Sequence, residues 1–216
     1  MIEALTPWLG DRAARLDAVA AGRLYGMGAL LEEFFDPHNV GAALRSCEAM
    51  GVPTVHVIIA RYPFRVSTRV TQGCERWLEV HRHRSVEESV AALHAAGFHL
   101  YAAVPGAPLA VGDLPTDRKI ALAFGNEHLG LSPRLRALAD GEFSIPMHGA
   151  SQSLNVSVSV AISLHAATEA RRRALGRPGD LDDDALLRLR ARYYASDVRG
   201  ARGLVEHLLR TRAAGC

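Results

Sequence analysis

Three separate segments of the chain place polar side chains and glycines among strongly apolar residues. Such a mixture is typical of sites where a loop or the start of a helix meets a ligand, so these segments are the first candidates for chemistry. They are DPHNVGAALRSCEAMGV (36–52), FGNEHLGLS (124–132) and IPMHGASQSLNVSVSVAI (145–162).

In the first segment, Arg45 is the residue that packing explains least well. It interrupts a helix face of apolar and small residues, where a charged guanidinium requires a partner or a function. Arginine suits two-pronged contacts with phosphate. Asn39 has a simpler explanation, because asparagine is common at the start of a helix. We expect Asn39 to cap a helix that begins at the next residue.

Each of the other two segments has two explanations. Residues 124–132 form a glycine-flanked acidic loop after a strongly apolar strand, where a parallel sheet usually binds its ligand. An ordinary connecting loop would have the same composition. Residues 145–162 combine a glycine loop with polar side chains that lead into a helix, and a serine-rich buried helix is the alternative. Taken singly, the segments leave these alternatives open.

Several familiar signatures are absent from the sequence. It has no GxGxxG after a strand, no GxxxxGK[ST] and no GxSxG. Cys47, Cys74 and Cys216 lie far apart without a CxxC pair, which argues against a zinc site or a disulfide framework and favours a reducing cytoplasm. His81 and His83 could suggest a metal site, but on a strand only alternate residues share a face, and we expect no acidic or cysteine partner beside them. We therefore expect surface or edge histidines and no metal site.

The charge is uneven along the 216 residues, although the net charge is only +2. Basic residues predominate in 54–84 and 171–216, whereas acidic residues predominate in 1–53 and 85–170. Such blocks are expected if one face of the protein meets phosphate and another does not. Every basic residue except Lys119 is an arginine, so a compositional bias explains the pattern equally well.

The composition favours a soluble cytoplasmic protein with one α/β core. Hydrophobic residues make up 49% of the chain and charged residues 22%, which is ordinary for a globular protein. The first residues, MIEALTPWLGDR, lack the basic and then apolar pattern of a signal peptide. No apolar run approaches the ~18 residues that a membrane span needs.

Apolar periodicity predicts strands that alternate with helices, which is typical of an α/β fold with a parallel sheet and crossover helices. Strands are expected at 29–35, 54–60, 77–83, 99–104, 119–125 and 141–147, and helices at 11–21, 40–50, 85–96, 133–139, 185–195 and 197–211. Residues 61–77 are expected to form an exposed basic loop with short helical turns, and residues 105–117 a second loop. Residues 153–175 are ambiguous, because valine and serine alternate as in a strand before a plainly helical stretch.

Taken together, the three polar segments resemble the SpoU family of RNA 2′-O-methyltransferases, within the knotted SPOUT superfamily. HNVGAALRSCEAMG is similar to the family's N-x-G-A-x-x-R-[ST] motif, FGNEHLGLS to its F-G-x-E-x-x-G-[LV]-S motif, and IPMHGASQSLNVSVSVAI to its I-P-M-x-G-x-x-x-S-L-N-V-S-V-A motif. The one departure is Ser159, where the family usually has alanine. The resemblance covers roughly residues 30–175 and is closest to the TrmH-type subgroup, which methylates guanosine 18 in the tRNA D-loop.

The resemblance implies a fold, a division of the chain and an assembly. The carboxyl-terminal part of the parallel sheet would thread into a deep trefoil knot, and residues 153–175 would be a helix that leaves the knot. A SPOUT methyltransferase domain (29–176) would lie between two helical extensions (1–28 and 177–216). SpoU enzymes are homodimers, so two chains would share two sites, with Arg45 of one chain completing the pocket of the other.

The resemblance also implies S-adenosylmethionine (AdoMet) as the methyl donor, a tRNA substrate and no metal. Arg45 would orient an RNA phosphate and stabilise the developing alkoxide. The residues that would hold Arg45, the ribose and the adjoining loop are Asn39, Glu127, Ser153 and Asn155. Backbone groups would bind AdoMet around Phe124, Gly125, Asn126, Ile145, Met147 and Leu154. The arginines that we expect to bind RNA are Arg12, Arg15, Arg171, Arg172 and Arg173.

Other functions are compatible with parts of the pattern. The enzyme could methylate another RNA, such as rRNA or the tRNA anticodon loop. A knotted RNA-binding module without catalysis is disfavoured because Arg45, Glu127, Ser153 and Asn155 are all present. An α/β enzyme that acts on a small molecule is disfavoured by the arginine blocks and the terminal helices.

Overall fold

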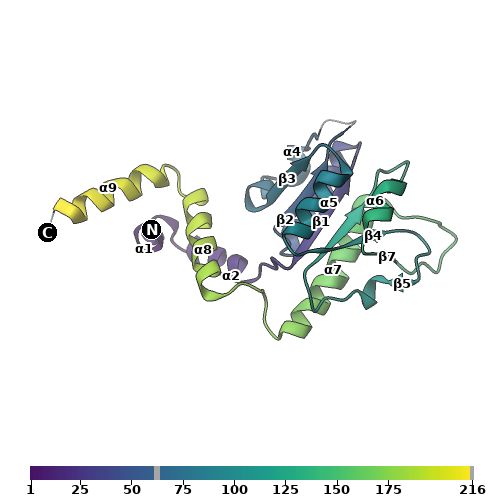
Figure 1. Cartoon of the computed structure of the whole chain (residues 1–216). Coiled ribbons are helices and arrows are strands. Elements are labelled where there is room, and N and C mark those ends of the chain that lie inside the picture. The colour runs from purple at the N-terminus through teal and green to yellow at the C-terminus, as the bar shows by residue number, and fades with distance from the viewer. Residues whose placement is uncertain (61–63, 215–216) are drawn as a thin grey trace. The chain divides into compact units, whose positions relative to one another are not determined.

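A seven-stranded parallel sheet forms the core of residues 24–177 in the computed structural model, which describes residues 1–60 and 64–214 (Figure 1). The strand order is β3-β2-β1-β6-β4-β7-β5. The strands are β1 (Met27–Glu32), β2 (Thr54–Ile58), β3 (Glu79–His83), β4 (His99–Ala103), β5 (Leu109–Ala110), β6 (Ile120–Phe124) and β7 (Gly141–Ser144). Each neighbouring pair runs parallel. The predicted α/β class with a parallel sheet is therefore confirmed, whereas the trefoil knot stays a prediction.

Helices precede, connect and follow these strands. They are α1 (Ile2–Leu9), α2 (Arg12–Ala21), α3 (Pro37–Ala49), α4 (Thr68–Thr71), α5 (Val86–Ala95), α6 (Pro133–Leu138), α7 (Val156–Leu175), α8 (Asp183–Asp197) and α9 (Ala201–Ala214), with 3₁₀ turns η1 (Cys74–Trp77) and η2 (Val111–Asp113). The ambiguous segment 153–175 is mostly the helix α7, as the family resemblance implies. Its buried residues Val160, Leu164 and Ala167 recur every three or four positions, so the helical period prevails over the local alternation.

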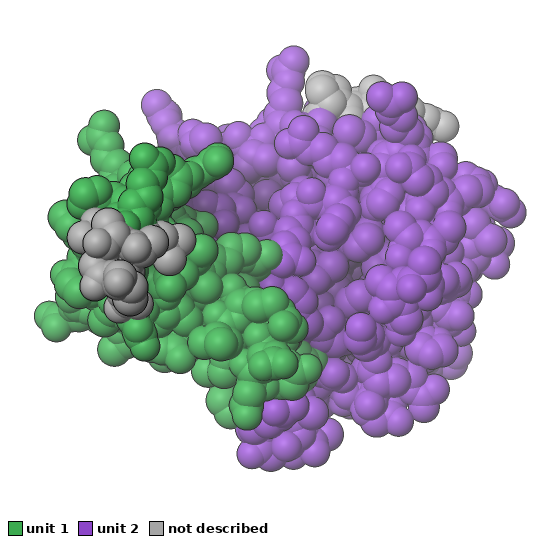
Figure 2. Space-filling view, turned by 60° about the vertical axis from the view of Figure 1, so that its left-hand side comes forward, with its two compact units in different colours: residues 1–23, 178–216 green, residues 24–177 purple. Residues whose placement is uncertain are grey.

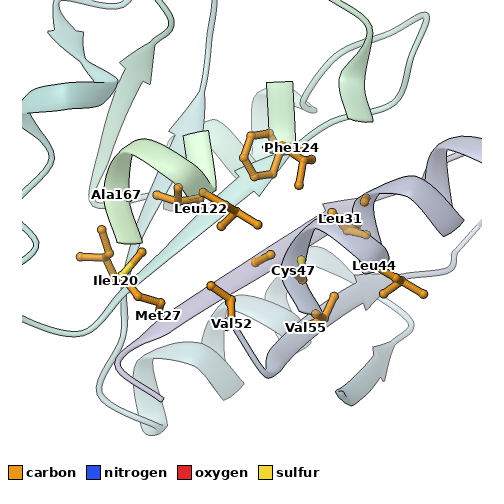
Figure 3. Packing of buried hydrophobic residues seen from close by; sticks show 14 of the residues in the cluster. Met27, Leu31, Leu44, Cys47, Val52, Val55, Ile120, Leu122, Phe124 and Ala167 are labelled. Carbon is orange, nitrogen blue, oxygen red and sulfur yellow. The ribbon is translucent and has the colours of Figure 1, made fainter. Parts of the chain in front are cut away.

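The sheet is covered by helices on both faces. On one face, α3 and α7 pack against β1, β2 and β6, and Figure 3 shows Leu44 and Ala167 among the side chains of this core. On the other face, α5 and α6 contribute Leu93 and Leu135 to a second core. Consecutive residues of β1, such as Leu30 and Leu31, therefore enter opposite cores and are both buried. The sequence of a strand that is buried on both faces is one continuous apolar run.

Helix α3 begins earlier than its sequence predicts, and the expectation that Asn39 caps it is wrong. The cap is Asp36, whose Oδ1 accepts a hydrogen bond of 2.8 Å from the backbone N–H of His38. Pro37 follows at the first helical position, which proline favours because its φ angle suits a helix and its missing N–H would be unpaired there. Asn39 consequently lies inside the first turn, where its side chain contacts residues outside the helix.

Other boundaries also differ from those predicted. Strand β1 ends at Glu32 rather than at residue 35, because Glu33 adopts a left-handed backbone conformation with φ of 54°. The predicted loop 105–117 contains β5 and η2, and α1 was not predicted. In the predicted basic loop, α4 and η1 are the expected short helical turns, while residues 61–63 lie outside the described residues.

The predicted surface or edge position is confirmed for His81 and His83, although His83 is buried at this edge. Both lie on β3, an edge strand of the sheet, and His81 is exposed. His83 is buried, with its Nε2 2.9 Å from Nδ1 of His56 and its Nδ1 3.5 Å from a carboxylate oxygen of Glu88. These partners come from β2 and α5, which the local sequence could not show. Within the described part of the chain, no group of three or more histidine, cysteine and acidic residues could hold a metal ion.

The chain divides into two compact units, coloured separately in Figure 2. The α/β unit comprises residues 24–177, and the helical unit comprises residues 1–23 and 178–216. Most of the two predicted extensions (1–28 and 177–216) thus falls in one helical unit, whereas residues 24–28 and 177 belong to the α/β unit. Within the helical unit, the Arg190 guanidinium makes two 2.6 Å hydrogen bonds to Asp17, which also accepts one from Tyr194. No helix among the described residues is both long enough and apolar enough to cross a membrane.

Candidate active site

A cavity of about 840 Å³ opens at the carboxyl ends of β4, β6 and β7. The segments that line it follow these three strands directly or precede α7, at 103–106, 124–131, 143–147 and 151–156. The carboxyl edge of a parallel sheet is where ligands usually bind, and this volume is in the range of cofactor and small-molecule pockets. Polar groups from the loops meet apolar walls formed by side chains such as Phe124 and Phe143.

The structure brings most of the predicted site residues together in this cavity. Those that line it are Asn39, Phe124, Gly125, Asn126, Glu127, Ile145, Met147, Ser153, Leu154 and Asn155. Three distant stretches of sequence therefore meet at one place. His128, Ser151 and Gln152 also line the cavity and were not predicted, although all three lie inside the polar segments that the sequence singles out.

The carboxylate of Glu127 connects the loop after β6 with the start of α3. It accepts hydrogen bonds from the backbone N–H groups of Phe35 and Asp36, at 3.1 and 3.2 Å, and one of 2.9 Å from Asn39 Nδ2. Partial burial raises the pKa of Glu127, but the hydrogen bonds from Asn39, Phe35 and Asp36 outweigh this effect and the net shift is downward. The ionised form is therefore the one that the site stabilises.

Asn155 continues this network toward α7. Its Nδ2 donates a 3.1 Å hydrogen bond to Asn39 Oδ1, while its own Oδ1 accepts from the backbone N–H of Ser157 at 2.9 Å. Asn155 is thus the N-cap of α7 as well as a lining residue of the cavity. The chain Glu127–Asn39–Asn155 joins the three segments through hydrogen bonds between side chains.

The loop that follows β6 is tightly folded. Asn126 and Gly130 exchange two backbone hydrogen bonds of 3.0 and 2.9 Å. At Gly125 a Cβ atom would overlap the backbone of Gly130 and Leu131, so only glycine allows the two arms of the loop to meet. The Asn126 side chain donates to Glu33 O at 2.7 Å and accepts from His128 N at 2.9 Å. This residue holds the loop in shape.

Arg45 is not among the residues that line the cavity. It lies six residues after Asn39 on α3, which is roughly 240° around the helix and therefore on another side. Its side chain is exposed, and its Nη1 donates a 3.3 Å hydrogen bond to Val70 O on α4. Gly41 permits this approach of α4, since a Cβ there would lie 3.0 Å from Val70 Cβ. Within one chain, the predicted catalytic cation and the cavity are separate.

Of the predicted RNA-binding arginines in the α/β unit, two have partners inside the protein. Arg171 is 8% exposed, and its Nη1 donates to the carbonyl oxygens of Thr116 and Arg118 at 3.0 and 2.8 Å. Arg172 donates to Met50 O at 2.9 Å. Arg173 is exposed.

The two predicted RNA-binding arginines of the helical unit also differ from each other. Arg12 forms an ion pair of 2.8 Å with Asp197. Arg15 is exposed. Arg12, Arg15 and Arg173 are thus all exposed, but Arg12 is held by its ion pair with Asp197.

An exposed apolar stripe runs from the cavity along α7. Val158 and Ile162 are four residues apart on α7, so their side chains lie on one side of the helix, and Leu154 directly precedes the N-cap Asn155. Leu154, Val158 and Ile162 are 37%, 44% and 38% exposed, respectively. Leu154 also lines the cavity, which makes the stripe continuous with the candidate site.

Comparisons with known proteins agree with this arrangement. The model of the SpoU rRNA methylase family matches residues 27–165. A tRNA (guanosine(18)-2′-O)-methyltransferase from Thermus thermophilus is 34% identical over 164 residues, which are 76% of this chain and 84% of the relative.

Solved structures show the same similarity. The A. aeolicus TrmH/SpoU tRNA modifying enzyme covers 89% of this chain and 99% of its own, with a TM-score of 0.77 and 26% identity. The SpoU methyltransferase AviRb from Streptomyces viridochromogenes, solved with AdoMet, covers 69% of this chain and 59% of its own, with a TM-score of 0.57 and 28% identity. The matched residues include all three segments that build the cavity, and the chain belongs to the SpoU rRNA methylase family.

Proposed function

We propose that this protein is an AdoMet-dependent tRNA 2′-O-methyltransferase that modifies guanosine 18 of the D-loop. The observation that carries the proposal is the meeting of Asn39, Glu127 and Asn155, from three distant segments, at one cavity on the carboxyl edge of the sheet. The similarity to tRNA (guanosine(18)-2′-O)-methyltransferases supports this substrate. A tRNA substrate also favours a cytoplasmic location.

The cavity fits AdoMet in its size and in its mixture of groups. AdoMet would supply an electrophilic sulfonium methyl group for transfer. Apolar side chains such as Phe124, Ile145 and Met147 would enclose its less polar parts, and the backbone of the same loops would provide hydrogen bonds. Glu127 and Asn126 would act indirectly, by holding the loop after β6 against the start of α3.

Most of the catalysis would come from placing the ribose hydroxyl in line with the methyl group. Arginine's pKa above about 12 makes it a poor proton acceptor, so Arg45 would serve as a fixed cation that orients phosphate and stabilises the developing alkoxide. Ser153 and Asn155 would hold the ribose. For the contact with RNA outside the cavity, the exposed residues Arg15 and Arg173 are the best candidates of the predicted set.

We further propose that the active form is a homodimer in which each site is shared. Arg45 lies outside the cavity of its own chain, so a second chain is needed to bring a cation to the site. The exposed stripe Leu154–Val158–Ile162 begins at the cavity and would be covered by a second copy of the chain. In a twofold dimer each chain would contribute its Arg45 to one site and its cavity to the other.

The substrate is tested by incubating the protein with AdoMet and unmodified tRNA, then mapping the methylated nucleotide by mass spectrometry. We expect 2′-O-methylguanosine at position 18, and no product on a transcript in which that ribose lacks the 2′-hydroxyl. Methylation of the anticodon loop or of rRNA instead would overturn the substrate and keep the enzyme class. Binding of tRNA without methylation would overturn the enzyme class itself.

The shared site is tested by mixing Arg45→Ala with Asn155→Ser under conditions that allow subunit exchange. Serine is chosen because it can still cap α7, so loss of activity does not follow from an unravelled helix. Each variant alone should be inactive. Random pairing makes about half of the dimers mixed, and one site in each mixed dimer has neither substitution, so activity should rise towards about a quarter. If exchange is demonstrated and activity does not return, the site lies within one chain.

A further inference from the structure

A buried acidic residue stands at the end of the central strand β1. Glu32 is 4% exposed, in a strand whose other residues are apolar and equally buried. A buried carboxylate is costly unless it accepts hydrogen bonds. One oxygen of Glu32 accepts a 2.8 Å hydrogen bond from the backbone N–H of Ser132, which follows the loop after β6. Neither the sequence motifs nor the cavity lining includes Glu32.

This hydrogen bond forms one of three attachments between the same loop and the same short stretch of chain. We define the cofactor loop as residues 125–131. Near its start, Asn126 donates to Glu33 O, and in its middle Glu127 accepts from residues 35, 36 and 39. Where it ends, Ser132 donates to Glu32. All three attachments lead to residues 32–39, which directly continue β1.

The cofactor loop is held rigid by contacts between its own residues. Its orientation relative to the cavity therefore depends on its attachments to the rest of the chain. Its two arms are joined by the Asn126–Gly130 backbone pair and meet closely at Gly125. A stiff hairpin held near its start and its middle can still pivot about these points. The hydrogen bond at Ser132 is the attachment that opposes this rotation. The tip of the loop is by contrast exposed, with Leu129 at 72%.

We propose that Glu32 is a positioning residue for AdoMet binding, which acts by fixing Ser132 and thereby the angle of the cofactor loop over the cavity. It does not touch the ligand. The inference rests on the proposed function for the identity of that ligand. Because Glu32 acts before the reaction begins, its loss should weaken the binding of AdoMet and leave the methyl-transfer step nearly intact once AdoMet is saturating.

The test compares Glu32→Met with Glu32→Gln in the full-length protein. Both replacements have nearly the length of glutamate, so neither leaves a large void, but only glutamine retains an oxygen that can accept from Ser132 N–H. AdoMet affinity is measured by calorimetry, and kcat and KM for AdoMet with saturating tRNA. We expect Glu32→Met to weaken AdoMet binding about tenfold or more, the effect of losing a hydrogen bond to a charged group. Glu32→Gln should stay within about threefold of the wild type.

A matched control separates positioning from general loss of stability. Val90, on α5, is buried in the second core and is not among the residues that line the cavity, so Val90→Ala should lower the melting temperature without changing AdoMet affinity. If Glu32→Met behaves like Val90→Ala, with a lower melting temperature and unchanged AdoMet affinity, the proposal is overturned. If the wild type itself binds no AdoMet, the proposed function fails instead.

The same bond is also removed from its other partner, in case Glu32→Met does not fold. Ser132 has a φ of −63°, the value that proline requires, so Ser132→Pro deletes the N–H donor at little backbone cost. Its comparison is Ser132→Ala, which loses the same hydroxyl and keeps the N–H. We expect Ser132→Pro to bind AdoMet about tenfold more weakly than Ser132→Ala does. Equal affinities of these two variants would contradict the positioning role.

Discussion

Two sides of the same helix, α3, differ in how many hydrogen bonds their polar side chains make to other segments of the chain. On one side, Asn39 donates to Glu127 and accepts from Asn155, so its position is set by both neighbouring segments. On the other side, Arg45 is exposed and contacts Val70 O at 3.3 Å. The Asn39 side chain is held by hydrogen bonds within its own chain, whereas the exposed guanidinium of Arg45 is accessible to a second molecule. Under the proposed function, such a site would separate the binding of AdoMet from the completion of catalysis by Arg45.

The strongest test of this contrast is Arg45→Ala. Because Arg45 lies outside the cavity, its loss should leave AdoMet affinity nearly unchanged. Turnover should fall by a factor on the order of 10²–10³, as expected for the loss of one electrostatic stabiliser of a transition state. The measurement is the methylation rate at saturating tRNA and AdoMet. A variant that keeps more than about a tenth of the wild-type rate would remove Arg45 from the mechanism.

Glu127→Ala should have the opposite profile. It leaves the N–H groups of Phe35 and Asp36 and the Asn39 amide without their common acceptor, so both stability and AdoMet affinity should decline. We expect a loss of about 1–3 kcal/mol in the free energy of unfolding, which lowers the melting temperature by about 2–4 °C for each kcal/mol. Calorimetry on this variant and on Arg45→Ala gives the comparison directly. Equal melting temperatures for the two would mean that the Asn39 side is not held by Glu127.

Acid should weaken the hydrogen bonds on the Asn39 side of α3 by protonating Glu127. The folded pKa of Glu127 lies below its unfolded value, near 4.3, so its contribution to stability is present above that value and is lost as the pH falls through the folded pKa. Melting temperatures measured down to about pH 3 should therefore fall less steeply for Glu127→Gln than for the wild type. Parallel curves would show that Glu127 ionises alike in both states.

A second acid effect must be separated from the first. Burial, followed by the neighbouring His81 and His83, lowers the pKa of His56 from 6.5 to about 4. The folded state then binds fewer protons than the unfolded state between these values, so stability falls as the pH drops from about 6.5 towards 4. His56→Asn should make the melting temperature depend less on pH in this window. The decline at lower pH, which we assign to Glu127, should remain. An unchanged slope between pH 6.5 and 4 would exclude His56 as its source.

The smallest effects are expected at the end of α7. Arg173→Gln should reduce the slope of log affinity against log salt for tRNA by less than about one, since it removes at most one phosphate contact. Arg171→Gln should lower the melting temperature instead, because its guanidinium bonds the carbonyl groups of Thr116 and Arg118. Binding curves at several salt concentrations measure the first effect. If Arg171→Gln changes the salt slope and Arg173→Gln does not, the assignment of these two residues is reversed.

The sequence predicts the parts of this molecule that depend on local pattern. Continuous apolar runs identified β2 and β6 as buried strands, and polar residues after such strands identified the loops of the cavity. Local pattern failed where a distant residue decides the outcome. The role of Asn39 depends on Glu127, and the burial of His83 depends on His56 and Glu88. Glu32 was not singled out, because its partner Ser132 lies 100 residues further along the chain.

The composition of the helical unit has a consequence for synthesis on the ribosome. Leu5, Leu9 and Leu16 of α1 and α2 are buried in the folded protein, yet α8, which contacts these helices, follows the whole α/β unit in the chain. The apolar side of α1 and α2 is therefore exposed to solvent while the α/β unit is translated. An exposed apolar surface of this kind attracts chaperones and promotes aggregation in a nascent chain. Joining the two ends through a linker and opening the chain within a surface loop would let α1, α2 and α8 emerge together.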